Sequence, residues 1–209
     1  MFFRNRMLGA FPLALGLGAA LFLAGQSPAS AHGVVYKALS KNVEARGNHG
    51  DVIKHECKLF GAVAVMAQTR VKLEAVVSSN ADCDECKELD GKAILNGVFV
   101  LRTAPGIEFG THDMVGVLTN PAGRKFILVF DGTLNCGTHR VPVAECERCR
   151  VENHMEGCLK AYVRNADGSR GALKARATYA GKWQRDPAGG TGLSLLLAID
   201  GVCIHPCVH

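Results

Sequence analysis

The stretch VAVMAQTRVKLEAVV, residues Val63–Val77, decides the fold. Its odd-numbered positions are apolar or small, whereas Gln68, Arg70, Lys72 and Glu74 occupy even-numbered positions. Alternation with a period of two is typical of a strand that buries one face. Several of the residue types favour a helix locally, but the β-branched content and the alternation favour one long bent strand or two short strands.

Six later segments also have the composition of strands and are separated by clusters of Gly, Pro, Asn and Asp. They are Lys92–Thr103, Asp113–Thr119, Arg124–Asp131, Leu159–Arg164, Leu173–Trp183 and Gly192–Asp200. Phe126–Phe130 and Leu195–Ile199 are apolar without alternation, which is expected of strands covered on both faces. We therefore predict an all-β fold, namely an antiparallel β-sandwich of the immunoglobulin-like or a similar type, stapled by disulfides.

The chain of 209 residues is 48% hydrophobic and 21% charged, a composition typical of a folded globular protein. We expect a single β-rich domain at residues 57–209. Residues 41–50 are polar and contain glycine, so we expect residues 32–56 to form an N-terminal arm or a long loop. The formal net charge of +5 is too small to indicate a nucleic-acid partner.

Residues 1–31 have the features of a secretory signal peptide. Arg4 and Arg6 precede the apolar stretch Met7–Ala24, and Ala29–Ala31 supplies small residues for cleavage. Glycines and Pro12 within the apolar stretch disfavour the alternative, a transmembrane anchor. We expect cleavage, no membrane span in the mature chain, and a periplasmic or secreted location.

Nine cysteines are unusual for a chain of this length, and an exported protein is expected to oxidise them. All lie after residue 31: Cys57, Cys83, Cys86, Cys136, Cys146, Cys149, Cys158, Cys203 and Cys207. We predict disulfides that fasten loops and termini, each stabilising the fold by about 2–4 kcal/mol. The pairing cannot be deduced from the sequence, and the odd number leaves one cysteine over.

Metal ligation is the alternative use of these cysteines. Cys146, Cys149, His154 and Cys158 have the spacing Cys-x2-Cys-x4-His-x3-Cys, one residue short of the zinc-knuckle spacing. The pair Cys83 and Cys86 repeats the Cys-x2-Cys motif, so two such pairs could form a four-thiolate site. A thioredoxin-like redox use is disfavoured because no βαβ pattern accompanies either pair.

The carboxyl terminus places Cys203, His205, Cys207 and His209 at every second position. On an extended chain these side chains share one face, and sulfur with imidazole suits Cu(I) or Zn(II). A disulfide that closes the last strand is the simpler interpretation.

Cleavage after Ala31 would make His32 the first residue of the mature protein. An N-terminal histidine can chelate copper through its α-amine and its ring. In this respect His32-Gly33 resembles the copper site of secreted oxygenases that attack polysaccharides and of periplasmic copper carriers, both of which are β-sandwiches. The resemblance implies a second imidazole ligand, and the sequence leaves several candidates open: His49, His55, His112, His139 and His154.

The chain lacks a Gly-x-Ser-x-Gly elbow, a phosphate-binding loop and a His-Glu-x-x-His motif, so we predict no catalytic residues. Our leading hypothesis is an exported, disulfide-stabilised binding or structural module with an unknown protein or small ligand and no cofactor. The alternative is a periplasmic or secreted copper- or zinc-binding protein that uses His32 and the Cys/His clusters. A copper-dependent oxidative enzyme is the third hypothesis.

Overall fold

The computed structural model describes residues 34–80, 86–104, 107–135, 153–186, 188 and 190–206. This part of the chain is almost entirely β-structure. Its strands are β1 (Val34–His49), β2 (Ile53–Leu59), β3 (Ala62–Ser79), β4 (Gly91–Ala104), β5 (Ile107–Thr119), β6 (Lys125–Asn135), β7 (Asn153–Arg164), β8 (Arg170–Arg185) and β9 (Gly192–Pro206). A short 3-10 helix, η1 (Cys86–Leu89), lies between β3 and β4.

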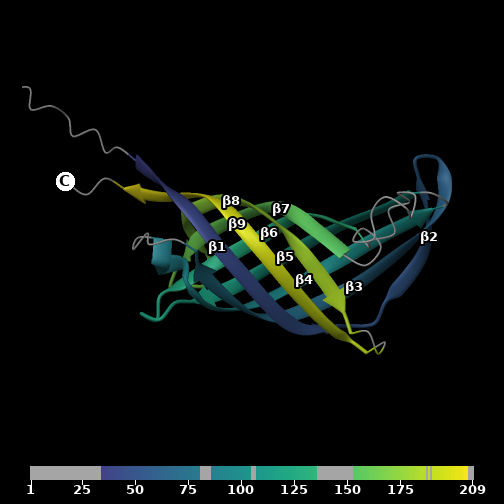
Figure 1. Cartoon of the computed structure of the whole chain (residues 1–209), viewed down its shortest axis with the longest axis horizontal. Coiled ribbons are helices and arrows are strands. Elements are labelled where there is room, and N and C mark those ends of the chain that lie inside the picture. Colours follow the sequence, from purple (N-terminus) through teal and green to yellow (C-terminus); the bar gives the residue numbers. More distant parts are fainter. Residues whose placement is uncertain are drawn as a thin grey trace, which may run out of the picture. The chain divides into compact units, whose positions relative to one another are not determined.

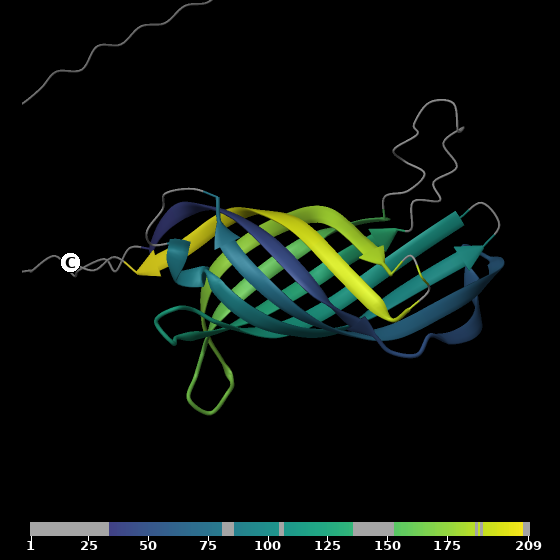
Figure 2. The same ribbon diagram turned by 60° about the horizontal axis from the view of Figure 1, so that its bottom comes forward.

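The strands form one antiparallel sheet that closes on itself. Their order is β1-β9-β8-β7-β6-β5-β4-β3-β2, and β1 also pairs with β3 from Lys41↔Ser79 to His49↔Val71. This pairing joins β1 and β3–β9 into a closed barrel of eight strands (Figures 1 and 2). The predicted β-sandwich is therefore wrong. Alternation is the same in a sandwich and in a barrel, and only the pairing of β1 with both β9 and β3 distinguishes them.

The predicted strand segments lie in strands. Val63–Val77 lies in the single long strand β3, and the six later segments lie in β4 to β9. In β3 the odd-numbered residues from Thr69 to Val77 are buried in the barrel. The expectation of two covered faces fails for Leu195–Ile199, because Leu196 is 56% exposed on the outer surface.

The segment expected to be an arm or a long loop, residues 32–56, instead supplies β1 and the start of β2. Its polar residues alternate with Leu39, Val43 and Ala45, which are buried on the inner face. Lys41 shares that inner face and is itself buried, at 2% exposure. This segment therefore forms a strand despite its polar composition, because its few apolar residues lie on the inner face and pack in the core.

Glycine occupies an inward-facing position in seven of the eight barrel strands that the structure describes. These are Gly47, Gly97, Gly116, Gly132, Gly157, Gly181 and Gly201. A Cβ added at any of them would lie 2.0–2.6 Å from a backbone carbonyl oxygen of a neighbouring strand. These glycines let the strands bend closely past one another, as a small closed barrel requires.

Apolar side chains fill the barrel, and η1 covers one end of it. Cys86 and Leu89 of η1 are buried in the same core as the barrel strands. Beside them, Lys41 Nζ lies 2.5 Å from Asp90 Oδ1, and Nζ also donates to Ser79 Oγ over 2.8 Å. We call this end the closed end and the opposite end the mouth.

The structure describes four of the nine cysteines: Cys57, Cys86, Cys158 and Cys203. No two of these are joined by a disulfide, so the described barrel is held together by strand pairing and core packing rather than by the predicted staples. The remaining disulfide candidates, Cys83, Cys136, Cys146, Cys149 and Cys207, lie outside the described residues. Within the described ranges, no helix has the length and apolarity needed to cross a membrane.

Candidate functional site at the barrel mouth

The mouth is the end at which β1, β4, β6 and β8 finish and at which β5, β7 and β9 begin. One part of the wall extends beyond it. The pairing of β3 with β1 ends at His49↔Val71, and its pairing with β2 begins at Ile53↔Gln68, so β2 continues the line of β1 after an irregularity. The β2–β3 hairpin therefore projects past the mouth (Figure 2).

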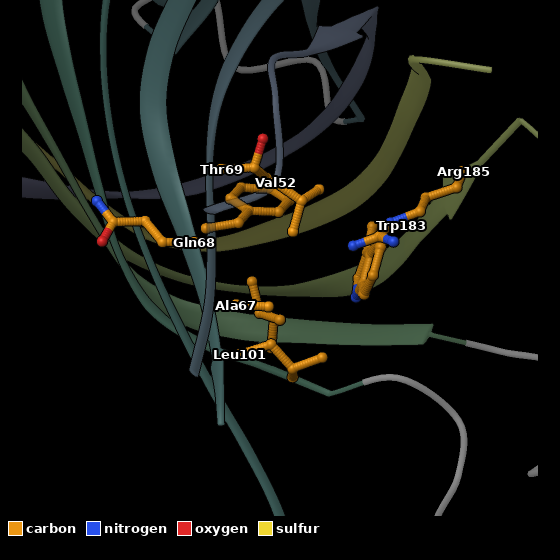
Figure 3. A pocket seen from close by; sticks show the side chains of 9 residues that line it. Val52, Ala67, Gln68, Thr69, Leu101, Trp183 and Arg185 are labelled. Carbon is orange, nitrogen blue, oxygen red and sulfur yellow. The ribbon is translucent and has the colours of Figure 1, made fainter. Parts of the chain in front are cut away.

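A small pocket lies in the mouth itself. Its volume is about 20 Å³, and it is lined by Val52, Ala67, Gln68, Thr69, Phe99, Leu101, Leu134, Trp183 and Arg185. In Figure 3, Ala67 and Leu101 lie on one side of the pocket, and Trp183 and Arg185 lie on the other. A space of this size holds about one water molecule and no organic ligand.

Aromatic rings form the floor of the pocket. Phe99 and Trp183 meet edge to face with ring centroids 6.1 Å apart. The Arg185 guanidinium lies 5.6 Å from the Trp183 ring centre, a cation–π contact that leaves its charge at the rim. Because Trp183 is only 2% exposed, the floor is a rigid part of the core.

A polar pair lies beneath this floor. The His112 ring contacts Phe99 edge to face with centroids 5.9 Å apart, and its Nε2 is hydrogen-bonded to the Tyr179 hydroxyl. His112 is 2% exposed, and its Nδ1 has no hydrogen-bond partner among the described residues. Burial lowers the pKa of His112 to about 4, and the nearby Asp131 carboxylate offsets this only partly. Burial also raises the pKa of Tyr179, so both groups are neutral at pH 7.

The buried histidine makes stability depend on pH. The unfolded chain binds a proton on His112 below its ordinary pKa of 6.5, whereas the folded chain binds one only near pH 4. The free energy of unfolding is therefore highest above pH 6.5. It decreases by up to about 3 kcal/mol as the pH drops toward 4. Urea unfolding between pH 7.5 and 4.5 measures this slope. His112→Gln is expected to flatten it, and an equally steep slope in that variant would contradict the assignment.

The projecting hairpin carries an exposed apolar face that continues the inner wall of the barrel. Val63 and Val65 alternate in step with Ala67 and Thr69, yet they are 62% and 48% exposed. The paired β2 residues on the same face are charged: Lys58 opposite Val63, Glu56 opposite Val65 and Lys54 opposite Ala67. We call Lys54, Glu56, Lys58, Val63 and Val65 the mouth face.

Beside the mouth face, β2 has a free backbone edge. Within the described part of the chain β2 pairs only with β3, and it stands last in the strand order. The barrel closes all its other strands against two neighbours over most of their length. A free edge presents unpaired N–H and C=O groups on which another extended chain can pair.

The tip of the hairpin is strained. Phe60 and Gly61 form the two-residue turn between Leu59 and Ala62, with φ angles of +49° and +84°. Positive φ at both positions is the requirement of a type I′ turn, which favours Asn or Gly in place of a bulky residue. Phe60 is also 83% exposed, so neither packing nor local conformation accounts for a phenylalanine at this position.

The structure brings only part of the predicted knuckle-like cluster into view. His154 and Cys158 lie four residues apart on the outer face of β7, and His154 Nε2 is 3.5 Å from Glu156 Oε2. Cys146 and Cys149 lie outside the described residues. Nowhere in the described ranges do three or more His, Cys, Asp or Glu side chains gather closely enough to hold a metal ion.

The other predicted ligands are scattered or undescribed. Cys203 faces the barrel core, whereas His205 lies in β9 opposite Val35. Cys207 and His209 lie outside the described residues, and so do His32 and residues 1–31.

The described histidines that could supply a second imidazole to a copper site lie in different parts of the barrel. His49 ends β1, His55 is exposed on β2, and His112 is buried beneath the mouth. His154 lies on β7, and His139 lies outside the described residues.

One feature of the sequence indicated the hairpin that carries the mouth face. Leu59-Phe60-Gly61-Ala62 joins two short apolar runs through a two-residue connection that ends in glycine, which indicates a hairpin. Val63 and Val65 were assigned to the buried face by alternation, and nothing in the sequence showed that the strand outruns the barrel.

Comparison with models of protein families, with curated proteins and with solved structures finds no match to this chain. Its function must therefore be argued from the barrel itself.

Proposed function

We propose that this chain is an exported, non-catalytic binding protein that takes an extended polypeptide segment at the mouth of its barrel. The observation that carries the proposal is the free edge of β2 beside the exposed Val63 and Val65. An added strand would pair its backbone with β2 and place alternate side chains on the mouth face. The signal-like pattern at residues 1–31 supports export.

The dimensions of the site favour a polypeptide over a small molecule. Among the described residues, apolar side chains fill the barrel interior, and the mouth pocket of about 20 Å³ is too small for an organic ligand. β2 offers seven residues of edge, which is long enough for an ordinary strand to pair along it. Affinity would then come from backbone hydrogen bonds and from covering the two valines.

The charges of the mouth face select an acidic segment. Lys54 and Lys58 flank Glu56, and Arg185 adds a positive charge at the rim of the pocket. Pairing of two β2 strands centred on Glu56 would place Lys54 opposite Lys58 and Glu56 opposite Glu56. Like charges directly opposite are destabilising, so a second copy of this edge is a poor partner.

The test uses a blocked heptapeptide, Val-Thr-Glu-Thr-Val-Thr-Glu, whose valines and glutamates share one face of an extended strand. The peptide is labelled with fluorescein, and its anisotropy is measured with the full chain. We expect saturable one-to-one binding that weakens at least about tenfold in Val65→Asp, because the exposed valine supplies apolar contact. The matched control is Val202→Asp, which changes an exposed valine on the outer face of β9.

Two control peptides distinguish backbone pairing with β2 from nonspecific apolar binding. A peptide N-methylated at every residue cannot donate backbone hydrogen bonds and is expected to lose binding. The same peptide with lysine in place of glutamate is expected to bind more weakly, because its positive charges would meet Lys54 and Lys58. Equal binding of the methylated peptide, or no binding of any peptide, would refute the proposed function.

We expect Phe60 to lower the stability of the fold and to strengthen peptide binding. Phe60→Asn places a residue suited to positive φ in the turn and should stabilise the fold by about 1 kcal/mol. The same change removes an exposed ring next to the mouth face and should weaken peptide binding. Chemical denaturation and the anisotropy assay measure both effects. A variant that is less stable than the natural chain would contradict the strain at residue 60.

A further inference from the structure

The free edge of β2 is blocked at the end that lies nearest the barrel mouth. β3 pairs with both β1 and β2, so the free side of β2 is the side on which β9 pairs with β1. That pairing extends to Asn48↔Gly192, and the His49 N–H donates to the Thr191 carbonyl oxygen over 2.8 Å. The start of β9 therefore occupies the line that an added strand would follow past Ile53. An extended segment paired with β2 has to end there or bend away.

The orientation of an added strand decides which of its termini reaches this blocked end. β2 runs outward from the mouth, from Ile53 to Leu59. A strand antiparallel to β2 runs inward, so its C-terminus arrives at the mouth, whereas a parallel strand would bring its N-terminus there. Antiparallel pairing is slightly more stable per residue, which favours arrival of the C-terminus.

Arg185 places a positive charge at the blocked end. It is the last residue of β8, lies opposite Leu193 of β9 in the strand register and lines the mouth pocket. Its guanidinium lies 5.6 Å from the centre of the Trp183 ring, and among the described residues it makes no ion pair within 4.0 Å. The neighbouring Asp186 carboxylate does not line the pocket and accepts the Ala188 N–H over 2.9 Å.

We propose that the segment captured on β2 is the C-terminal end of another polypeptide, whose terminal carboxylate binds the Arg185 guanidinium. This inference rests on the proposed function and names the class of partner. A guanidinium can donate two parallel hydrogen bonds to one carboxylate. A chain end also suits a blocked edge, because no residues have to continue past it. Arg185 would repel the ammonium group of an N-terminus and so disfavours the parallel orientation.

The test compares two forms of the heptapeptide Val-Thr-Glu-Thr-Val-Thr-Glu, one with a free C-terminal carboxylate and one with a C-terminal carboxamide. Both carry fluorescein at the N-terminus, and their anisotropy is measured with the full chain at low salt. We expect the free acid to bind about fivefold more tightly, which is the effect of one exposed ion pair of good geometry.

Substitutions on β8 assign this preference to one side chain. Arg185→Gln should remove the difference between the two peptides, and Arg185→Lys should keep part of it, because lysine retains the charge without the bidentate geometry. Arg185 is exposed, so both variants should keep the fold, which circular dichroism checks. The matched control is Arg176→Gln, which removes an exposed arginine from the outer face of the same strand and should leave the preference unchanged.

Extended peptides test whether the chain end lies at the mouth. Three glycines added after the C-terminal residue would carry the carboxylate away from Arg185 and should abolish the advantage of the free acid. Three glycines added before the N-terminal residue should leave that advantage unchanged.

The outcomes distinguish carboxylate recognition from strand capture. Equal binding of the acid and the carboxamide, with both weakened by Val65→Asp, would overturn carboxylate recognition and leave strand capture standing. A preference for the acid that persists in Arg185→Gln would overturn the role of Arg185. Absence of binding by either peptide would overturn both proposals.

Discussion

Gly181→Ala is expected to destabilise the barrel by at least about 3 kcal/mol. Gly181 lies on β8 between Tyr179 and Trp183, paired with Met155 of β7 and Leu197 of β9. An added Cβ would lie 2.0 Å from the Leu196 carbonyl oxygen and 2.8 Å from Leu197 Cα. Both atoms belong to the backbone of β9, so relief requires a strand to move rather than a side chain to rotate.

The sign of the change in stability distinguishes a steric clash between strands from the intrinsic effect of replacing glycine by alanine. Replacing glycine by alanine where the backbone tolerates it usually stabilises a protein by about 0.4–1 kcal/mol, because the unfolded chain loses freedom. Gly50→Ala is the matched control, since the nearest atom to its added Cβ is the Arg70 carbonyl oxygen at 3.7 Å. Urea unfolding should show a large loss for Gly181→Ala and little change or a small gain for Gly50→Ala. Equal effects would contradict the role of the inward glycines.

Asp90→Ala is expected to cost about 3 kcal/mol of stability, because it leaves the Lys41 ammonium buried without a counter-charge. Lys41 is 2% exposed, and its Nζ contacts Asp90 Oδ1 at 2.5 Å and Ser79 Oγ at 2.8 Å. Ser79 Oγ also donates to Asp90 Oδ1 over 2.9 Å, so the three groups form a closed triangle. This triangle lies where η1 meets β1 and β3, and it fixes the covered end of the barrel.

A double variant tests whether the loss comes from the uncompensated charge. Replacing a buried ion pair by apolar residues is often neutral, so Lys41→Met combined with Asp90→Ala should recover most of the stability lost in Asp90→Ala. Thermal unfolding of the single and double variants measures this recovery. If the double variant is no more stable than Asp90→Ala, the cost arises from lost packing around η1 and not from the lysine charge.

Local periodicity was enough to predict the strands but not their closure. Thr69 to Val77 alternate as expected, and their inner positions are buried. The pairing of β1 with β3 joins residues 41–49 to residues 71–79, and nothing within either segment specifies that contact. Inward glycines in seven of the eight barrel strands were the available signal of a tightly bent barrel, but each glycine alone is also compatible with a turn or a bulge.

The candidate site was the less predictable part. Cysteine and histidine spacing directed the sequence interpretation toward disulfides and metals, and most of those residues lie outside the described structure. The mouth face depends on where β3 leaves the barrel, which is set by the end of its pairing with β1 at His49↔Val71. Val63 and Val65 have the alternation of buried residues, yet they are 62% and 48% exposed where β3 has passed the end of its pairing with β1.

Hydrogen exchange along β2, with and without the valine- and glutamate-containing heptapeptide, tests the proposed function most directly. Amides within Ile53–Leu59 that face the free edge should exchange quickly in the free chain, because they have no strand partner among the described residues. We predict that the peptide slows exchange in this segment and that its N-methylated counterpart does not. Binding that leaves β2 exchange unchanged, or that slows exchange only in strands away from the mouth, would contradict strand capture at the mouth.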